Sequence, residues 1–196
     1  YACHNTTLDF FKWCGDYSGF AQLNLEEAHP GAVAMFYMGC GADQNPLPRR
    51  SLDLAQKYGQ MLSTAVDDVL GGSMQPLDAS LRCEFEMLTL NLGAAPTREE
   101  LEKMAAESPN YLQRWAARLL KDMNAGKEFS RTYPYPVQAW LLGKKQLWIA
   151  LGGEVVVDYA LAIKKEHGSD VWVAGYANDV MAYIPSLRVL DEGGYE

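Results

Sequence analysis

The sequence predicts an α/β fold in which helices flank a mixed β-sheet. Strand-like and helix-like segments alternate through the second half of the chain, and this order favours the α/β class. The chain has 196 residues, of which 48% are hydrophobic and 21% charged, so it is long and apolar enough to bury a core. We therefore expect residues 1–196 to form a single domain or a fragment of one.

The first third of the chain predicts one strand and one helix after an irregular start. Residues 1–30 have few periodic stretches, which indicates a strand end followed by a long loop of the kind that is often functional. The apolar run 32–38 is short and bounded by glycines, so it predicts a buried strand. In residues 49–70 the apolar side chains recur with a period of 3.6, which predicts a helix that stops at Gly71 and Gly72.

The middle of the chain predicts a strand and two helices. Residues 79–92 alternate in part between apolar and polar side chains and predict a strand with an exposed edge. Thr97 followed by Glu100 is a capping-box pattern for a helix to about residue 107. Ser and Pro at the start of 108–124 open a second helix.

The last third predicts a hairpin, a helix and a strand. Segments 134–142 and 146–151 form the hairpin, which turns at a Gly-Lys-Lys sequence. A helix is expected from about 154 to 167 after two glycines, and a buried strand over 171–177. Residues 178–196 have no regular pattern and are expected to be irregular.

Charge and hydropathy exclude two classes of partner. The net charge is −8 and no cluster of basic residues exceeds a pair, so binding to a phosphate backbone is not expected. No apolar run approaches the roughly 20 residues that cross a bilayer, and no signal pattern opens the chain. Because the chain begins at Tyr1 rather than Met, we expect a fragment or a processed product.

The cysteines do not predict a disulfide-rich or Cys-x-x-Cys zinc protein. There are four, too few and too irregularly spaced for either class. One disulfide between Cys3 and Cys14 remains an alternative; otherwise the cysteines are expected to be small core residues. Cys40 and His4 together also allow a nucleophile and base pair, although nothing in the local sequence orients them.

Two loops hold residues that fit a binding site. Asp43 lies in the small-residue loop Gly39-Cys-Gly-Ala-Asp-Gln-Asn-Pro46, at the carboxyl end of an expected strand, where ligands of α/β sheets bind; a plain turn is the alternative. Glu154 follows an apolar strand and two glycines, so it is either a metal ligand or a carboxylate at a helix N-terminus.

These segments, taken in order, are similar to motifs of the neutral (alkaline, non-lysosomal) ceramidase family. The family shows a histidine after a short strand, a Gly-Asp-x-Ser-Pro loop, a strand ending in Pro-Gly-Glu, and two tyrosines twelve residues apart. Here the counterparts are His4, the loop Gly-Ala-Asp43-Gln-Asn45-Pro46, Ala-Leu-Gly-Gly-Glu154, and Tyr183 with Tyr195-Glu196. The resemblance covers nearly the whole chain and implies the C-terminal part of a larger ceramidase-like catalytic domain.

The resemblance implies a zinc (Zn²⁺) site. In the family two histidines, a glutamate and a tyrosine bind the metal, and three of them correspond to His4, Glu154 and Tyr183. The other histidine belongs to sequence before Tyr1, so a preceding segment is an expected partner of the site. Tyr195 resembles the tyrosine that hydrogen-bonds the reacting carbonyl or oxyanion, and Asp43 and Asn45 correspond to the substrate loop.

Two departures from the family pattern affect the substrate. Asn45 stands in the place of the family's serine, so an amide replaces a hydroxyl at the substrate. Gly152 stands in the place of the proline of Pro-Gly-Glu. These departures affect the expectation of a ceramide substrate more than the expectation of amide hydrolysis.

The expected function is zinc-dependent hydrolysis of a linear amide, ceramide-like in the family, by metal-activated water. The alternatives are a zinc esterase or amidase for another small substrate, and a non-catalytic fragment or subunit that binds a complementary chain. The resemblance also implies a secreted, periplasmic or cell-surface location.

Overall fold

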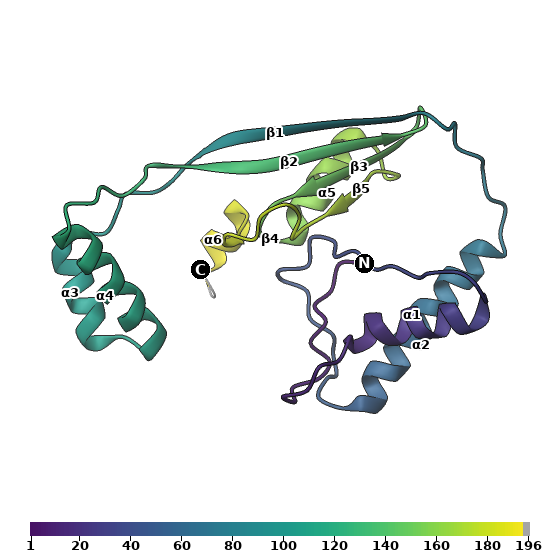
Figure 1. The fold of residues 1–196 in the computed structure, drawn as a ribbon, viewed down its shortest axis with the longest axis horizontal. Coiled ribbons are helices and arrows are strands. Elements are labelled where there is room, and N and C mark those ends of the chain that lie inside the picture. The colour runs from purple at the N-terminus through teal and green to yellow at the C-terminus, as the bar shows by residue number, and fades with distance from the viewer. Residues whose placement is uncertain (194–196) are drawn as a thin grey trace. The chain divides into compact units, whose positions relative to one another are not determined.

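A computed structural model describes residues 1–193 and shows an α/β fold with a mixed sheet, as the sequence predicted. The chain divides into two compact units, one formed by Tyr1–Glu86 with the segment from Pro136 onward, and the other by Met87–Tyr135. Figure 1 shows the helices and strands of both. All the residues of the candidate site that the structure describes belong to the first unit.

The main sheet has four strands in the order β1-β2-β3-β5. Strands β2 and β3 are antiparallel with Trp140 opposite Trp148, which confirms the predicted hairpin, whereas β3 and β5 are parallel with Ile149 opposite Val173. Parallel neighbours require a crossover connection, and α5 lies within it. The bounds are β1 Leu81–Asn91, β2 Thr132–Leu142, β3 Gln146–Leu151, β5 Trp172–Ala174 and α5 Val157–His167.

A second, two-stranded sheet changes the prediction around residue 154. Strand β4 (Glu154–Val155) pairs in parallel with β6 (Tyr183–Ile184), so the helix expected from Glu154 begins only at Val157. The last segment is also more regular than predicted, because β6 is followed by α6 (Leu187–Glu192). This small sheet brings Tyr183 beside Glu154.

The sequence predicted a long loop within residues 1–30, but Asp16–Ala28 form helix α1. The loop prediction was therefore wrong over these residues. Tyr17 and Ala21 of this helix are buried, and it packs against α2 (Leu52–Leu70), as Figure 1 shows. The predicted helix over 49–70 is confirmed, and the Ser51 side chain caps it by accepting from Leu54 N.

The strand predicted over residues 32–38 does not form, and the prediction of burial was also wrong. Val33 is 80% exposed and Met35 is 88% exposed. The polar backbone groups of Ala34 bond side chains of α1 instead of a neighbouring strand: its carbonyl accepts from Gln22 Nε2 and its N–H donates to Glu26 Oε1. An apolar run without a ladder partner therefore stays irregular and largely in solvent.

The second unit contains the two helices predicted from their caps. Helix α3 (Arg98–Glu107) has the full capping box, with Thr97 Oγ1 accepting from Glu100 N and the Glu100 carboxylate accepting from Thr97 N. Helix α4 (Asn110–Asn124) follows Pro109 and packs against α3. The capping residues in the sequence were thus sufficient to predict both helices.

The cysteines are free in the structure. Cys3 and Cys14 form no disulfide, and Cys40 is fully buried as a core residue. Cys14 and Cys83 are exposed, which contradicts the expectation that the cysteines pack in the core. Among residues 1–193 no helix is long and apolar enough to span a bilayer.

Arg188 on α6 forms an ion pair with Asp158 on α5. Its Nε donates to Asp158 Oδ2 at 2.9 Å, and Ser186 Oγ donates to the same oxygen at 2.5 Å. The hydrogen bond from Arg188, with a smaller contribution from Ser186, holds the pKa of Asp158 below its ordinary value of 3.8. A carboxyl with a depressed pKa stabilises the fold above that value, and the contribution is lost as pH falls through the folded pKa.

We expect Asp158→Asn to be less stable than the wild type at neutral pH, because the ionised partner of Arg188 is lost. The difference should shrink as pH falls below about 4, where the wild-type carboxyl is also protonated. Urea unfolding of both proteins between pH 7 and pH 3 measures it. A difference that stays constant over this range would contradict the assignment.

Candidate functional site

Glu154 is placed by the two glycines that precede it. Gly153 has φ of +74°, a conformation that glycine adopts without cost, and its N–H donates to the Asp179 carbonyl at 2.7 Å. The Glu154 N–H then donates to the Ala182 carbonyl at 2.9 Å. The backbone of Glu154 is thus held by hydrogen bonds to the segment that leads into β6.

His4 is held by one carbonyl group of the loop 39–46. Its backbone N–H and its ring Nδ1 both lie 2.9 Å from the Gln44 carbonyl oxygen. Because a carbonyl oxygen only accepts hydrogen bonds, this contact requires the proton on Nδ1. A neutral His4 therefore directs the lone pair of Nε2 away from the loop.

The two side chains meet although 150 positions separate them. His4 Nε2 lies 2.9 Å from Glu154 Oε1, and the side chains are 22% and 28% exposed. With the proton on Nδ1, a lone pair faces a carboxylate oxygen, and such a contact requires a cation between them. That cation is either a second ring proton or a metal ion.

Tyr176 is a third member that the sequence analysis missed. Its hydroxyl lies 3.2 Å from Glu154 Oε1 and 3.5 Å from His4 Nε2. Burial and the neighbouring Glu154 carboxylate raise the pKa of Tyr176, so the phenol is a neutral hydrogen-bond donor at neutral pH. The sequence offers one signal for it, its position near the carboxyl end of the strand predicted over 171–177.

The structure also brings Tyr183 to Glu154. The two residues are direct partners in the parallel β4–β6 pair, where neighbouring strands are about 4.8 Å apart. The Tyr183 ring packs against the core cluster of Ala42, Val156 and Val189. Tyr183 is thus the strand partner of Glu154, and its role as a metal ligand remains a prediction. Tyr195 lies outside the described residues.

Asp43 makes structural contacts in the loop. Its Oδ1 accepts from Val157 N at 2.9 Å, at the first turn of α5, and its Oδ2 lies 3.5 Å from Arg188 Nη2. A carboxylate there satisfies an N–H group that a helix leaves unpaired. The structure thus gives Asp43 a capping contact, and its predicted role in substrate binding remains a prediction.

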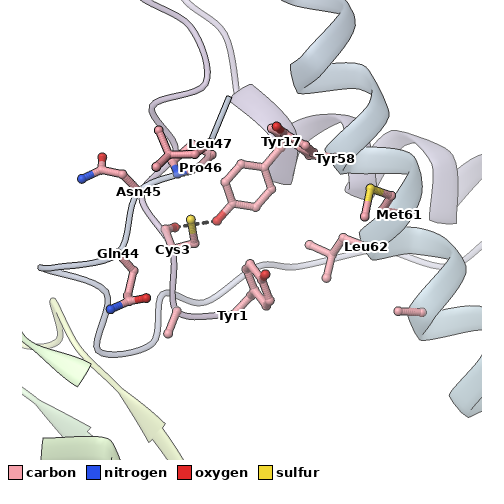
Figure 2. A pocket seen from close by; sticks show the side chains of 12 residues that line it. Tyr1, Cys3, Tyr17, Gln44, Asn45, Pro46, Leu47, Tyr58, Met61 and Leu62 are labelled. Carbon is pink, nitrogen blue, oxygen red and sulfur yellow. Dashed lines mark hydrogen bonds between the residues drawn. The ribbon is translucent and has the colours of Figure 1, made fainter. Parts of the chain in front are cut away.

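Asn45 lies at the rim of a cavity of about 460 Å³. Its Oδ1 accepts from Thr6 Oγ1 at 3.1 Å and from Arg49 Nη1 at 3.2 Å. Figure 2 shows the side chains around this cavity, which include Tyr1, Cys3, Tyr17, Gln44, Asn45, Leu47, Tyr58, Met61 and Leu62.

The cavity adjoins the His4 side of the site. Cys3 and Gln44 line it, and these are the chain neighbour of His4 and the residue whose carbonyl binds the His4 ring. Tyr17 Oη donates to the Cys3 carbonyl at 2.5 Å and so ties this wall to α1. The volume of the cavity is within the range of small-molecule sites. Such sites are mostly apolar.

Cys40 does not fit the alternative of a nucleophilic thiolate. The residue is fully buried, and burial raises the pKa of its thiol to about 11. A thiolate is the reactive form of cysteine, and little of it is present at neutral pH. The His4 ring is in addition engaged by Gln44 and Glu154.

The donor set fits zinc. Ligating histidines commonly donate their second ring N–H to a backbone carbonyl, and His4 has this arrangement with Gln44. Two ligands of a tetrahedral zinc ion stand roughly 3.3 Å apart, so the 2.9 Å between His4 Nε2 and Glu154 Oε1 needs only a small opening. Within residues 1–193 no group of three His, Cys, Asp or Glu side chains could hold a metal ion, so His4 and Glu154 are a pair of donors and Tyr183 remains the predicted third ligand.

Comparison with protein-family models, curated proteins and solved structures found no match for this chain.

Proposed function

We propose that this protein is a zinc-dependent hydrolase that cleaves a linear amide bond, with ceramide-like N-acyl lipids as the substrate class. The contact that carries the proposal is His4 Nε2 at 2.9 Å from Glu154 Oε1, with the other ring nitrogen bound to a carbonyl. The order of motifs that resembles neutral ceramidases supports the substrate class. The apolar cavity beside His4 supports a substrate with a hydrocarbon portion.

The site's own residues have separate roles in this proposal. His4, Glu154 and Tyr183 hold the metal, and Gln44 orients the His4 ring. Zinc, when bound, polarises the amide carbonyl and lowers the pKa of a bound water so that hydroxide is available near neutral pH. Tyr195 donates a hydrogen bond to the reacting oxygen, and Asn45 contacts the substrate at the cavity rim.

Metal content and hydrolysis test the proposal together. We expect about one zinc per chain in the purified wild-type protein, measured by elemental mass spectrometry. Glu154→Gln should lose the metal, because a neutral amide is a poorer zinc ligand than a carboxylate. Glu166→Gln, which changes an exposed carboxylate on α5, is the matched control and should retain it. Wild-type protein without zinc, or with zinc unaffected by Glu154→Gln, would refute the proposal.

A substrate panel then separates the related chemistries. N-acyl amides with long and short chains, and the corresponding esters, are incubated with zinc-loaded protein. We expect cleavage of the amides to exceed cleavage of the esters and to increase with chain length, because the cavity is largely apolar. Preferential cleavage of esters would favour the alternative of a zinc esterase.

A second candidate function, binding to a complementary chain or subunit, has its own supporting observation. Phe11 is 107% exposed, Trp13 is 104% exposed and Phe85 on β1 is 53% exposed. Large apolar side chains of this kind mark interaction surfaces when they gather in patches. Light scattering of the purified chain tests the case in which the partner subunit is a second copy: a complex larger than the 21.8 kDa chain that Trp13→Ser disrupts would support it.

A further inference from the structure

Tyr176 has a backbone conformation that its side chain does not favour. Its φ is +55°, which is uncommon for residues other than glycine, asparagine and aspartate and costs on the order of 1–3 kcal/mol. Its N–H donates to the Gly153 carbonyl at 2.9 Å, and the preceding Gly175 N–H donates to the Met38 carbonyl at 3.0 Å. The surrounding backbone therefore imposes this conformation.

The backbone conformation of Tyr176 directs its phenol toward His4 and Glu154. The Tyr176 ring lies edge-on to the His4 ring, with centroids 6.4 Å apart and planes at 88°, and its hydroxyl reaches Glu154 Oε1 at 3.2 Å. The same carboxylate oxygen faces His4 Nε2. Tyr176 is thus a hydrogen-bond donor to the atom at which the imidazole and the carboxylate meet.

We propose that Tyr176 is a positioning residue whose phenol holds the Glu154 carboxylate toward His4, so that the two ligands are preorganised for the metal. The proposal rests on the zinc function proposed above. Partners that hydrogen-bond a ligating side chain commonly contribute 10–100-fold to metal affinity. A tyrosine phenol is protonated at neutral pH, since its ordinary pKa is about 10, so it can donate this hydrogen bond.

Zinc affinity of Tyr176→Phe, measured by competition with a chromophoric chelator, tests the proposal. We expect the affinity to fall about 10–100-fold while one zinc per chain still binds. Tyr159→Phe is the control, since it deletes a phenol that donates to the Pro185 carbonyl at 2.9 Å, and it should retain wild-type affinity. Unchanged affinity in Tyr176→Phe would overturn the proposal. Complete loss of stoichiometric binding would also overturn it, because Tyr176 would then be a ligand.

A crystal structure of metal-free Tyr176→Phe gives a readout that does not depend on zinc binding. We expect the Glu154 side chain to turn away from His4 Nε2 when the phenol is absent. A carboxylate that keeps its wild-type position would overturn the proposal, whether or not the wild type binds zinc. Tyr176→Asn provides a second variant, since asparagine tolerates positive φ, and the same displacement is expected in it.

Discussion

Replacing Gly153 with alanine should destabilise the protein by about 2–6 kcal/mol, the sum of backbone strain and overpacking. The φ of +74° disfavours any side chain. A Cβ atom at this position would also lie 2.5 Å from Ile184 Cγ1 and 3.0 Å from the Ala182 carbonyl oxygen. Both neighbours belong to the segment that pairs with Glu154, so relief of the clash would separate β4 from β6 and displace the carboxylate.

Urea unfolding measures this loss, and Gly31→Ala is the matched control. Gly31 also has positive φ, +91°, but a Cβ there meets nothing within 4 Å. The control should therefore lose only the strain contribution, on the order of 1–3 kcal/mol. Equal losses in the two variants would show that the contact with Ile184 does not constrain the turn.

Replacing Gly59 with alanine should destabilise the protein by about 1–3 kcal/mol, although alanine is the better helix former by about 1 kcal/mol. A Cβ at this position on α2 would lie 2.5 Å from Phe20 Cβ, 2.9 Å from the Tyr17 carbonyl oxygen and 3.0 Å from Ala21 N. Two of these atoms are backbone atoms of α1, so the helices must move apart to accept the methyl group.

Gly19→Ala is the control on the partner helix. Gly19 also lies inside a helix, but a Cβ there meets nothing within 4 Å. It should stabilise the protein by up to about 1 kcal/mol through helix propensity alone. Thermal unfolding of both variants checks the pair, and a stabilising Gly59→Ala would contradict the close approach of α1 and α2.

Local signals predicted those elements whose hydrogen bonds are local. The Thr97–Glu100 capping box and the hairpin that turns after Leu142 were found because cap and turn residues are adjacent in the sequence. Helix α1 was missed because its N-cap, Gly15, provides no side-chain cap. The strand predicted over 32–38 does not form, and at Ala34 the side chains of that unpredicted helix take the backbone hydrogen bonds that a neighbouring strand would make.

The sequence indicated two residues of the candidate site, Glu154 and His4, but not Tyr176. The glycine pair before Glu154 indicated a special turn, and the motif order suggested His4 as its partner. Tyr176 was not predictable from local pattern, because its positive φ is imposed by the Gly153 and Met38 carbonyls of distant segments. Propensity rules assign such a conformation to glycine or asparagine, not to tyrosine.

The separation of His4 from Glu154 has a consequence for biosynthesis. The two residues are 150 positions apart, and ribosomes add roughly 5–20 residues per second. His4 is therefore synthesised about 8–30 s before the carboxylate that it contacts. Closing a loop of this length also costs about 4 kcal/mol of chain entropy. Nascent polypeptides stalled before residue 154 should accordingly fold α1 against α2 but lack the imidazole–carboxylate pair.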